Sequence, residues 1–443
     1  MKKYLLHPLG IFIIVVHAVY FFLAIKIGSI YLVDSYGYLN QAKNIILHHS
    51  MYAEDWNALT LIDYFTIRPP LYAIIIAVIK SIIHSDYFVI AFQNLLSIFT
   101  FFMLWKLLDQ LMVAQRNISV SIVLALLLFP SQLIHANFIM TEIVFQALLM
   151  GVFYFSIQFY RKPVLKVTFL IAVLLSLAML TKPVVLLLGM ILFFLFALTN
   201  QKRLNILLPF LLLPITYHLV CLQNKHVTGY YHYSSIKIMA DVRVNAKYII
   251  AQKYGADSAS KFVSKVFDEA DVMNDYESRY LHIEQRCNEV YKQNKMTFAL
   301  LYGKGMVSTL LDPGRFDLAV FFGIQDNATT GFLHRYHTEG LRAIPDILRA
   351  QPIVLLIYLF FILLWNILLL IALGVFLFDK KNEWIIRVLV LLFVGYIVTA
   401  TGISGLCRYR VPVFPELIFA FAFALPKLLP FYKRKISHAR SSI

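Results

Sequence analysis

Charged residues are scarce in this chain, and their scarcity excludes a water-soluble globular protein. Only 14% of the 443 residues are charged, whereas 60% are hydrophobic and the mean hydropathy is +0.73. A soluble domain could not cover its surface from so small a supply of polar side chains. Apolar stretches near the length needed to cross a hydrocarbon core of about 30 Å recur along most of the sequence, so the bilayer is the expected solvent.

Cysteine is rare too, and several functional motifs are missing. The three cysteines, Cys221, Cys287 and Cys407, are widely spaced and form no CxxC pair, which argues against a disulfide framework and a zinc site. Without a Walker loop, a GxGxxG or a GxSxG elbow, nucleotide-driven and serine-hydrolase functions lose support. The net charge of +16 comes mostly from short connectors, where membrane topology explains it without nucleic acid.

The basic connectors predict an α-helical polytopic membrane protein with about ten spans and both termini in the cytoplasm. Lys and Arg gather on the cytoplasmic side, so basic connectors are assigned inside and the others alternate to the outside. The inside connectors are Lys2/Lys3, Lys106 to Arg116, Arg161 to Lys166, Lys202/Arg203, Lys380/Lys381 and Lys433 to Lys435. The predicted spans are 10–32, 87–107, 118–137, 142–160, 164–181, 183–200, 204–222, 352–378, 384–403 and 411–430.

The same topology divides the chain into three parts. We expect an N-terminal transmembrane module at 1–222, an extracytoplasmic loop at 223–350, and C-terminal transmembrane helices at 351–443. The first module contains an outer loop at 33–86. Within that loop, residues 71–84 are apolar but too short to cross, which predicts a re-entrant or interfacial helix.

The long outer loop is different in kind from the rest. Its polar first half predicts a small helical subdomain with amphipathic helices at 239–254, 257–271 and 275–295. From 297 to 322 the sequence is apolar again and has a turn signal at Asp312-Pro313-Gly314, which predicts a helix at the membrane interface.

Acidic residues at the outer ends of spans are candidates for function, because charge is costly at these positions. Asp34 lies just past the first span, where it either accepts a proton or caps the helix expected from Ser35 to His48. Glu142 begins a later span, and Lys182 follows Thr181 at the next outer turn. These two serve a polar cavity, a partner or a helix cap.

Arginines are the second group of candidates. Arg68 stands directly before Pro69-Pro70, while Arg408 and Arg410 stand at the outer edge of the last span. Arginine suits bidentate binding of phosphate, and lipid headgroups are the alternative partner. Taken together, these residues of the predicted outer face are those of a site with cations that bind phosphate and an acid that accepts a proton.

The ordered set of motifs resembles the GT-C class of polytopic glycosyltransferases, which includes protein O-mannosyltransferases and the aminoarabinose transferase that acts on lipid A. The similarity covers most of residues 1–200 and the last span, but not the loop at 223–350. Where the protein mannosyltransferases carry an acidic pair, Ser35 follows Asp34 here, which points to the wider bacterial branch. The similar segments are Asp34-Ser35-Tyr36-Gly37-Tyr38, Arg68-Pro69-Pro70-Leu71-Tyr72, Thr141-Glu142, Thr181-Lys182-Pro183 and Arg408-Tyr409-Arg410-Val411-Pro412.

This resemblance implies inverting transfer of a sugar from a polyprenyl phosphate to a glycan, lipid or protein acceptor, on the extracytoplasmic face of the inner (plasma) membrane. It implies that Asp34 is the general base for the acceptor hydroxyl. The leaving phosphate would be stabilised by Arg68, Lys182, Arg408 and Arg410. Glu142 would orient the acceptor or bind a divalent cation, which the chemistry does not require.

Two other functions stay open at this point. A lipid-linked glycan polymerase or ligase would also combine many spans with a large outer loop, and would use pyrophosphate-linked oligosaccharides. A secondary transporter or flippase would place its charges near the midplane of broken helices and often show an internal repeat. Here the charges favour the outer span ends and no repeat is visible.

Overall fold

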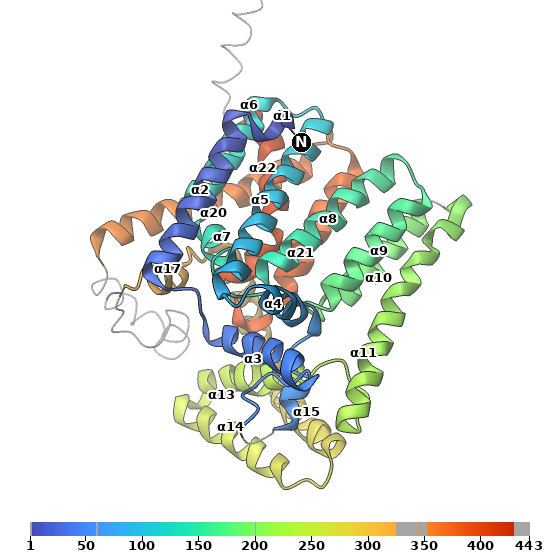
Figure 1. The fold of residues 1–443 in the computed structure, drawn as a ribbon, viewed down its shortest axis with the longest axis vertical. Coiled ribbons are helices and arrows are strands. Elements are labelled where there is room, and N and C mark those ends of the chain that lie inside the picture. Colours follow the sequence, from blue (N-terminus) through green and yellow to red (C-terminus); the bar gives the residue numbers. More distant parts are fainter. Residues whose placement is uncertain (1, 59–60, 200, 325–344, 346–351, 429–443) are drawn as a thin grey trace, which may run out of the picture.

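The computed structural model describes residues 2–58, 61–199, 201–324, 345 and 352–428, and all regular elements in these ranges are helices (Figure 1). The predicted helical fold class is confirmed to this extent. Within these described residues, six segments are long and apolar enough to cross a membrane, as in a helical membrane protein. They are α2 (Pro8–Ile27), α5 (Asp86–Gln110), α8 (Glu142–Arg161), Leu204–Thr228 with α11 (Leu212–Thr228), α20 (Ile353–Phe378), and Cys407–Leu428 with α22 (Phe414–Leu428).

Four predicted spans correspond to shorter apolar helices, so the count of ten stays a prediction. They are α6 (Gln115–Leu128), α9 (Leu165–Met179), α10 (Val185–Thr199) and α21 (Trp384–Ala400). The predicted span at 118–137 is divided after Phe129, and α7 (Pro130–His135) follows. Pro130 cannot donate a backbone hydrogen bond, but it fits the first position of a new helix.

The short helix predicted at 71–84 is present as α4 (Pro70–Ile82). Pro70 stands at its first position, where the missing N–H costs nothing. Whether α4 is re-entrant stays a prediction. The basic connector at 433–435 and the end of the loop, at 325–344 and 346–351, lie outside the described residues.

Two helices form the centre of the bundle. In α8 and in the Cys407–Leu428 segment most of the apolar window is buried, whereas α2 and α20 are largely exposed on the bundle surface. Phe153 of α8 packs edge-to-face between Phe393 of α21 and Phe419 of α22, with ring centroids 5.4 and 5.3 Å apart. Close packing on all sides fixes these helices, and therefore also the polar residues at their first turns.

A group of helices lies at the end of the bundle opposite the N-terminus, next to α3 (Val33–His48) (Figure 1). We call residues 236–293 the helical cap. Its buried side chains, Ile249, Val266 and Ile283 among them, form a hydrophobic cluster distinct from that of the bundle. The cap consists of α12 (Ile236–Ala240), a π-helical stretch (Asp241–Ala246), α13 (Lys247–Tyr254), α14 (Ala256–Asp271) and α15 (Tyr276–Gln293).

The predicted helices of this region are thus present, with one division. The helix expected at 239–254 begins earlier and has a π-helical stretch within it. Beyond the cap, α16 (Lys295–Leu311) and α17 (Arg315–Phe321) are separated at Asp312-Pro313-Gly314, where the turn was expected. Gly314 has φ = +78°, a conformation that glycine adopts readily.

A buried ion pair holds the cap against the first loop. Asp63, in the helical turn Ile62–Phe65, is 2% exposed. Its carboxylate accepts hydrogen bonds from Arg279 (2.5 Å) and from the Tyr276 hydroxyl (3.0 Å), both on α15. The Ser235 hydroxyl donates to the Asp63 carbonyl at 2.7 Å. A carboxylate satisfied in this way fixes the distance between loop and cap.

Two further contacts hold the residues that lead to Arg68. The His232 Nε2 lies 3.0 Å from the Thr66 hydroxyl, and the Ser234 hydroxyl donates to the Ile67 carbonyl at 3.1 Å. Burial lowers the pKa of His232, so its ring is neutral at physiological pH. The backbone just before Arg68 is therefore fixed by the segment that enters the cap.

Replacing Arg279 by methionine leaves the Asp63 carboxylate buried without its cation. We expect this variant to lose about 3–5 kcal/mol of unfolding free energy, and the double variant Asp63→Leu/Arg279→Met to lose much less. Denaturant unfolding in detergent, followed by proteolysis of the cap, measures both. Arg286→Met, on the same helix but in half-exposed pairs with Glu269 and Glu289, should cost under about 1 kcal/mol. Equal losses for the two single variants would contradict the anchoring role.

The predicted topology places the cap outside and the α20–α21 connector inside. All three native cysteines are buried, so single introduced cysteines can be labelled against a low background. In intact cells a membrane-impermeant maleimide should label Glu277→Cys, on the exposed side of α15, but Lys381→Cys only after permeabilisation. Labelling of both positions in intact cells would show that the topology is wrong.

Candidate functional site

Asp34 stands in the first turn of α3, directly after the first candidate span. Gly28 (φ = +77°) ends α2, and the Ser35 hydroxyl accepts a hydrogen bond from the Leu32 N–H at 2.8 Å, which fixes the start of α3. A carboxylate in the first turn is favoured by the partial positive charge of the helix N-terminus. The local sequence thus places an ionised acid at the end of an apolar helix.

Two arginines from distant parts of the chain share this carboxylate. Arg68 Nη2 lies 2.8 Å from Asp34 Oδ1, and Arg408 Nη1 lies 3.1 Å from Asp34 Oδ2. Each carboxylate oxygen therefore faces its own guanidinium. All three side chains are partly exposed, between 17% and 32%, so a ligand from solvent or from the bilayer surface can approach them.

Gly37 explains how Arg68 reaches Asp34. A Cβ at Gly37 would lie 3.3 Å from the Arg68 Nε, which is tighter than most contacts, and 3.5 Å from the Ala53 carbonyl oxygen, which is an ordinary contact. The guanidinium lies 4.6 Å from the Tyr38 ring centroid and donates to the Tyr38 hydroxyl at 3.3 Å. Within the motif at 34–38, Asp34, Gly37 and Tyr38 thus form the face of α3 against which the Arg68 side chain packs.

A second ion pair lies close by. Lys182 Nζ is 3.1 Å from Glu142 Oε1, and Glu142 is 1% exposed at the start of α8. The Tyr409 ring joins this pair to the first one, since its centroid is 5.9 Å from Lys182 Nζ and 4.9 Å from the Arg408 guanidinium carbon. The charge of Arg408 also acts on the Glu142 carboxylate.

The structure therefore brings together five of the six predicted site residues, Asp34, Arg68, Glu142, Lys182 and Arg408, which we call the charge cluster. Three cations against two carboxylates leave one net positive charge. A main-chain hydrogen bond from the Leu71 N–H to the Leu180 carbonyl (3.0 Å) connects the start of α4 to the end of α9 and supports the grouping.

Arg410 is the exception among the predicted residues. Its side chain is 1% exposed, donates to the carbonyls of Leu310 and Asp312, and lies 4.5 Å from the Phe129 ring centroid. These contacts satisfy carbonyls at the C-terminus of α16, where cations are favoured. The contacts described for Arg410 are thus with the backbone and an aromatic ring, and its predicted role in binding phosphate stays a prediction.

A buried polar network behind Arg408 was missed in the sequence. The Asp317 carboxylate accepts from Cys407 Sγ (3.0 Å) and lies 3.0 Å from His135 Nε2, while Asp312 Oδ2 accepts the Cys407 N–H at 3.0 Å. Both acids are in the α16–α17 region, predicted only as an interfacial helix. An aspartate in an otherwise apolar stretch was the available signal. This network fixes the backbone that carries Arg408.

Comparisons with known proteins give no match to this chain: no family model matches it, and no curated protein is similar enough to count as a relative. Within the described part of the chain, no group of three or more His, Cys, Asp or Glu side chains has the geometry of a metal site. The charge cluster is therefore a candidate site by its own geometry.

Burial raises the pKa of Asp34, but the charges of Arg408 and Arg68 outweigh burial and lower that pKa to about 2. Removing one cation, in Arg68→Met, should raise the pKa and increase the protonated fraction at about pH 5, tenfold for each pKa unit. A carbodiimide modifies protonated carboxyl groups, so mass spectrometry of the Asp34 peptide should show more modification in the variant.

Lys80→Met is the matched control, because Lys80 pairs with Asp86 at 2.7 Å, in another part of the same loop. It should leave the modification of Asp34 at the wild-type level. Equal modification of Asp34 in wild type and Arg68→Met would show that Arg68 does not hold the pKa down.

Proposed function

We propose that this chain is an inverting glycosyltransferase of the GT-C type, which transfers a sugar from a polyprenyl phosphate to an acceptor hydroxyl. The observation that carries the proposal is the Asp34 carboxylate between Arg68 and Arg408, at 2.8 and 3.1 Å. A proton acceptor and two phosphate-binding cations are the groups that this reaction needs. The resemblance of the sequence motifs to that class supports it independently.

The cations suit a lipid-linked monophosphate. Guanidinium groups bind phosphate oxygens through paired, charge-assisted hydrogen bonds, and Lys182 adds a point charge. Their place at the ends of apolar helices fits a donor whose tail lies in the bilayer and whose phosphate lies at its surface. As the glycosidic bond breaks, the electron pair leaves with the phosphate oxygen, and cations beside it stabilise that charge.

Asp34 is the general base in this proposal. Its carboxylate takes the proton of the acceptor hydroxyl while the acceptor oxygen bonds to the anomeric carbon, opposite the departing phosphate, so the configuration inverts. In the free protein both arginines weaken Asp34 as a base. A donor phosphate competes for Arg68 and Arg408, and its negative charge raises the pKa of Asp34 towards a useful range.

Glu142 has a positioning role in this scheme. It is buried and bonded to Lys182, so it holds the ammonium group beside Tyr409 and Arg408. A buried acid at the first turn of the central helix α8 also defines where the lysine stands relative to the bundle. The alternative roles for the Glu142 carboxylate are to orient the acceptor or to bind a divalent cation.

The proposal includes a cellular location. The enzyme is a multi-pass protein of the plasma membrane with both termini in the cytoplasm, and its active site faces the extracytoplasmic side beneath the helical cap. Its partners are the polyprenyl-phosphate sugar, the membrane lipids and an acceptor that is a glycan, a lipid or a protein. No nucleic acid takes part.

Transfer from radiolabelled polyprenyl-phosphate hexoses by the purified protein in detergent tests the proposal. Asp34→Asn should lower turnover by about 10²- to 10⁴-fold, as expected for loss of a general base. Arg408→Ala and Arg68→Lys should both weaken donor use, since lysine cannot form the paired hydrogen bonds.

Asp86→Asn is a matched control, because Asp86 is also an acid at a helix start and its partners are Lys80 and Tyr31, which are not in the charge cluster. Its activity should equal that of the wild type. Full transfer by a folded Asp34→Asn protein would overturn the base assignment. Movement of the sugar-lipid across the membrane without glycosyl transfer would instead identify a flippase.

A further inference from the structure

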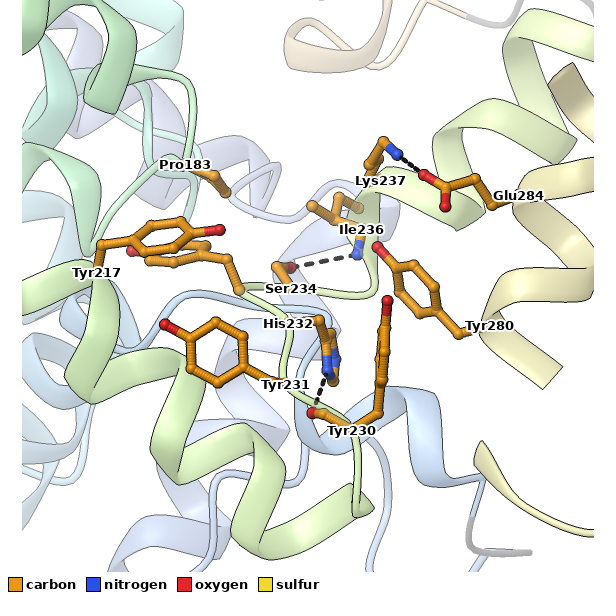
Figure 2. A pocket seen from close by; sticks show the side chains of 11 residues that line it. Pro183, Tyr217, Tyr230, Tyr231, His232, Ser234, Ile236, Lys237, Tyr280 and Glu284 are labelled. Atoms are coloured by element: carbon orange, nitrogen blue, oxygen red, sulfur yellow. Dashed lines mark hydrogen bonds and ion pairs between the residues drawn. The ribbon is translucent and has the colours of Figure 1, made fainter. Parts of the chain in front are cut away.

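A cavity of about 330 Å³ lies between the bundle and the helical cap, and tyrosines dominate its lining (Figure 2). Tyr217 of α11 and Tyr231 stand on one side of it, and Tyr230 and Tyr280 of the cap region on the other (Figure 2). Tyr233 is the fifth tyrosine of the lining. The volume is at the lower end of the range of small-molecule sites.

The cavity lies next to the charge cluster. Pro183, which lines it, directly follows Lys182 in the sequence. Ser234, another lining residue, donates its hydroxyl hydrogen to the carbonyl of Ile67, the residue before Arg68, at 3.1 Å. Lys182 is therefore bonded in sequence to a lining residue, and Arg68 to a residue that accepts a hydrogen bond from the lining. These are two cations of the proposed donor site.

The lining combines flat apolar faces with hydroxyl edges. Tyr217 stacks on Tyr233 with centroids 5.2 Å apart and planes 13° apart, and Tyr230 stacks on His232 at 5.5 Å and 16°. Such rings offer an apolar face and, at one edge, a hydrogen-bonding hydroxyl. A sugar ring has the matching pattern, with C–H groups on its faces and hydroxyl groups around its edge.

Other ligand classes fit the lining less well. A polyprenyl tail would be matched by aliphatic side chains, but Pro183 and Ile236 are the aliphatic residues of a lining that contains five tyrosines. A phosphate would need an uncompensated cation, whereas Lys237 is paired with Glu284 on the cap side of the cavity (Figure 2). A neutral hydroxylated ring uses both the aromatic faces and this ion pair.

The wall is also fixed before any ligand enters. The His232 ring is 6% exposed and is held on both sides, by the Tyr230 carbonyl (2.9 Å) and the Thr66 hydroxyl (3.0 Å). The Tyr231 hydroxyl is 2.8 Å from His218 Nδ1. Rings already held in place cost little conformational entropy on binding, which favours recognition of a rigid ligand.

We propose that this cavity binds a sugar unit of the acceptor, so that the acceptor of the proposed transferase is a glycan. The inference rests on the proposed function only where it calls the bound sugar part of the acceptor. Carbohydrate binding by the cavity can be measured whether or not the protein is a transferase. The bound sugar would lie beside Lys182 and Arg68, where its chain can present a hydroxyl to Asp34.

Binding of defined oligosaccharides to the full-length protein in detergent, without donor, tests this. The probes are oligomers of hexose, of N-acetylhexosamine and of uronic acid, observed by saturation-transfer NMR and titrated by calorimetry. We expect the wild type to bind at least one class, and Tyr217→Leu and Tyr231→Leu each to weaken that binding about tenfold or more. Tyr254→Leu, an exposed tyrosine of α13 outside the cavity, should bind like the wild type.

The outcomes separate the two proposals. Oligosaccharide binding that survives both cavity substitutions, or no binding to any class, overturns the carbohydrate assignment. If cavity-dependent binding is found but Asp34→Asn keeps full transferase activity, the cavity is a sugar site and the proposed mechanism is wrong. If transfer needs Asp34 but both cavity variants keep the wild-type KM for the acceptor, the cavity is not where the acceptor binds.

Discussion

The charge cluster depends on the Asp34 carboxylate, which pairs with both Arg68 and Arg408. These two arginines lie 34 and 374 positions away from Asp34 in the sequence. Three cations close together at the edge of an apolar bundle would repel one another strongly, because charges interact more strongly there than in water. The two carboxylates of the charge cluster make the grouping stable without a ligand. In the free protein, Asp34 is thus the anion that both arginines bind.

The rest of the structure keeps these partners in position. The Asp317 network fixes the backbone of Arg408, and the Asp63–Arg279 pair fixes the loop that leads to Arg68. Buried pairs of this kind contribute little net stability, because removing charges from water costs about as much as their attraction returns. Their value lies in specifying one geometry, which a site for a charged substrate requires.

The sequence predicts much of this, and the failures have physical causes. Hydropathy and basic connectors predict that Asp34, Arg68, Lys182 and Arg408 share one side of a bilayer, and the structure brings these four residues together. The sequence also groups Arg410 with them, but its contacts are with backbone carbonyls and Phe129, since hydropathy gives the depth of a residue and not the direction of its side chain. The contact of Asp63 with Arg279 spans 216 positions between polar segments, for which no periodicity indicates a partner.

The hydrogen bond from Ser234 to Ile67 has a consequence for the order of events. It connects the wall of the tyrosine cavity to the peptide beside Arg68, so the cavity and that guanidinium depend on the same stretch of backbone. Two ligands that bind at such connected places affect one another's affinity equally in both directions. For the proposed transferase, this means that binding in the cavity and binding at the charge cluster would be thermodynamically coupled.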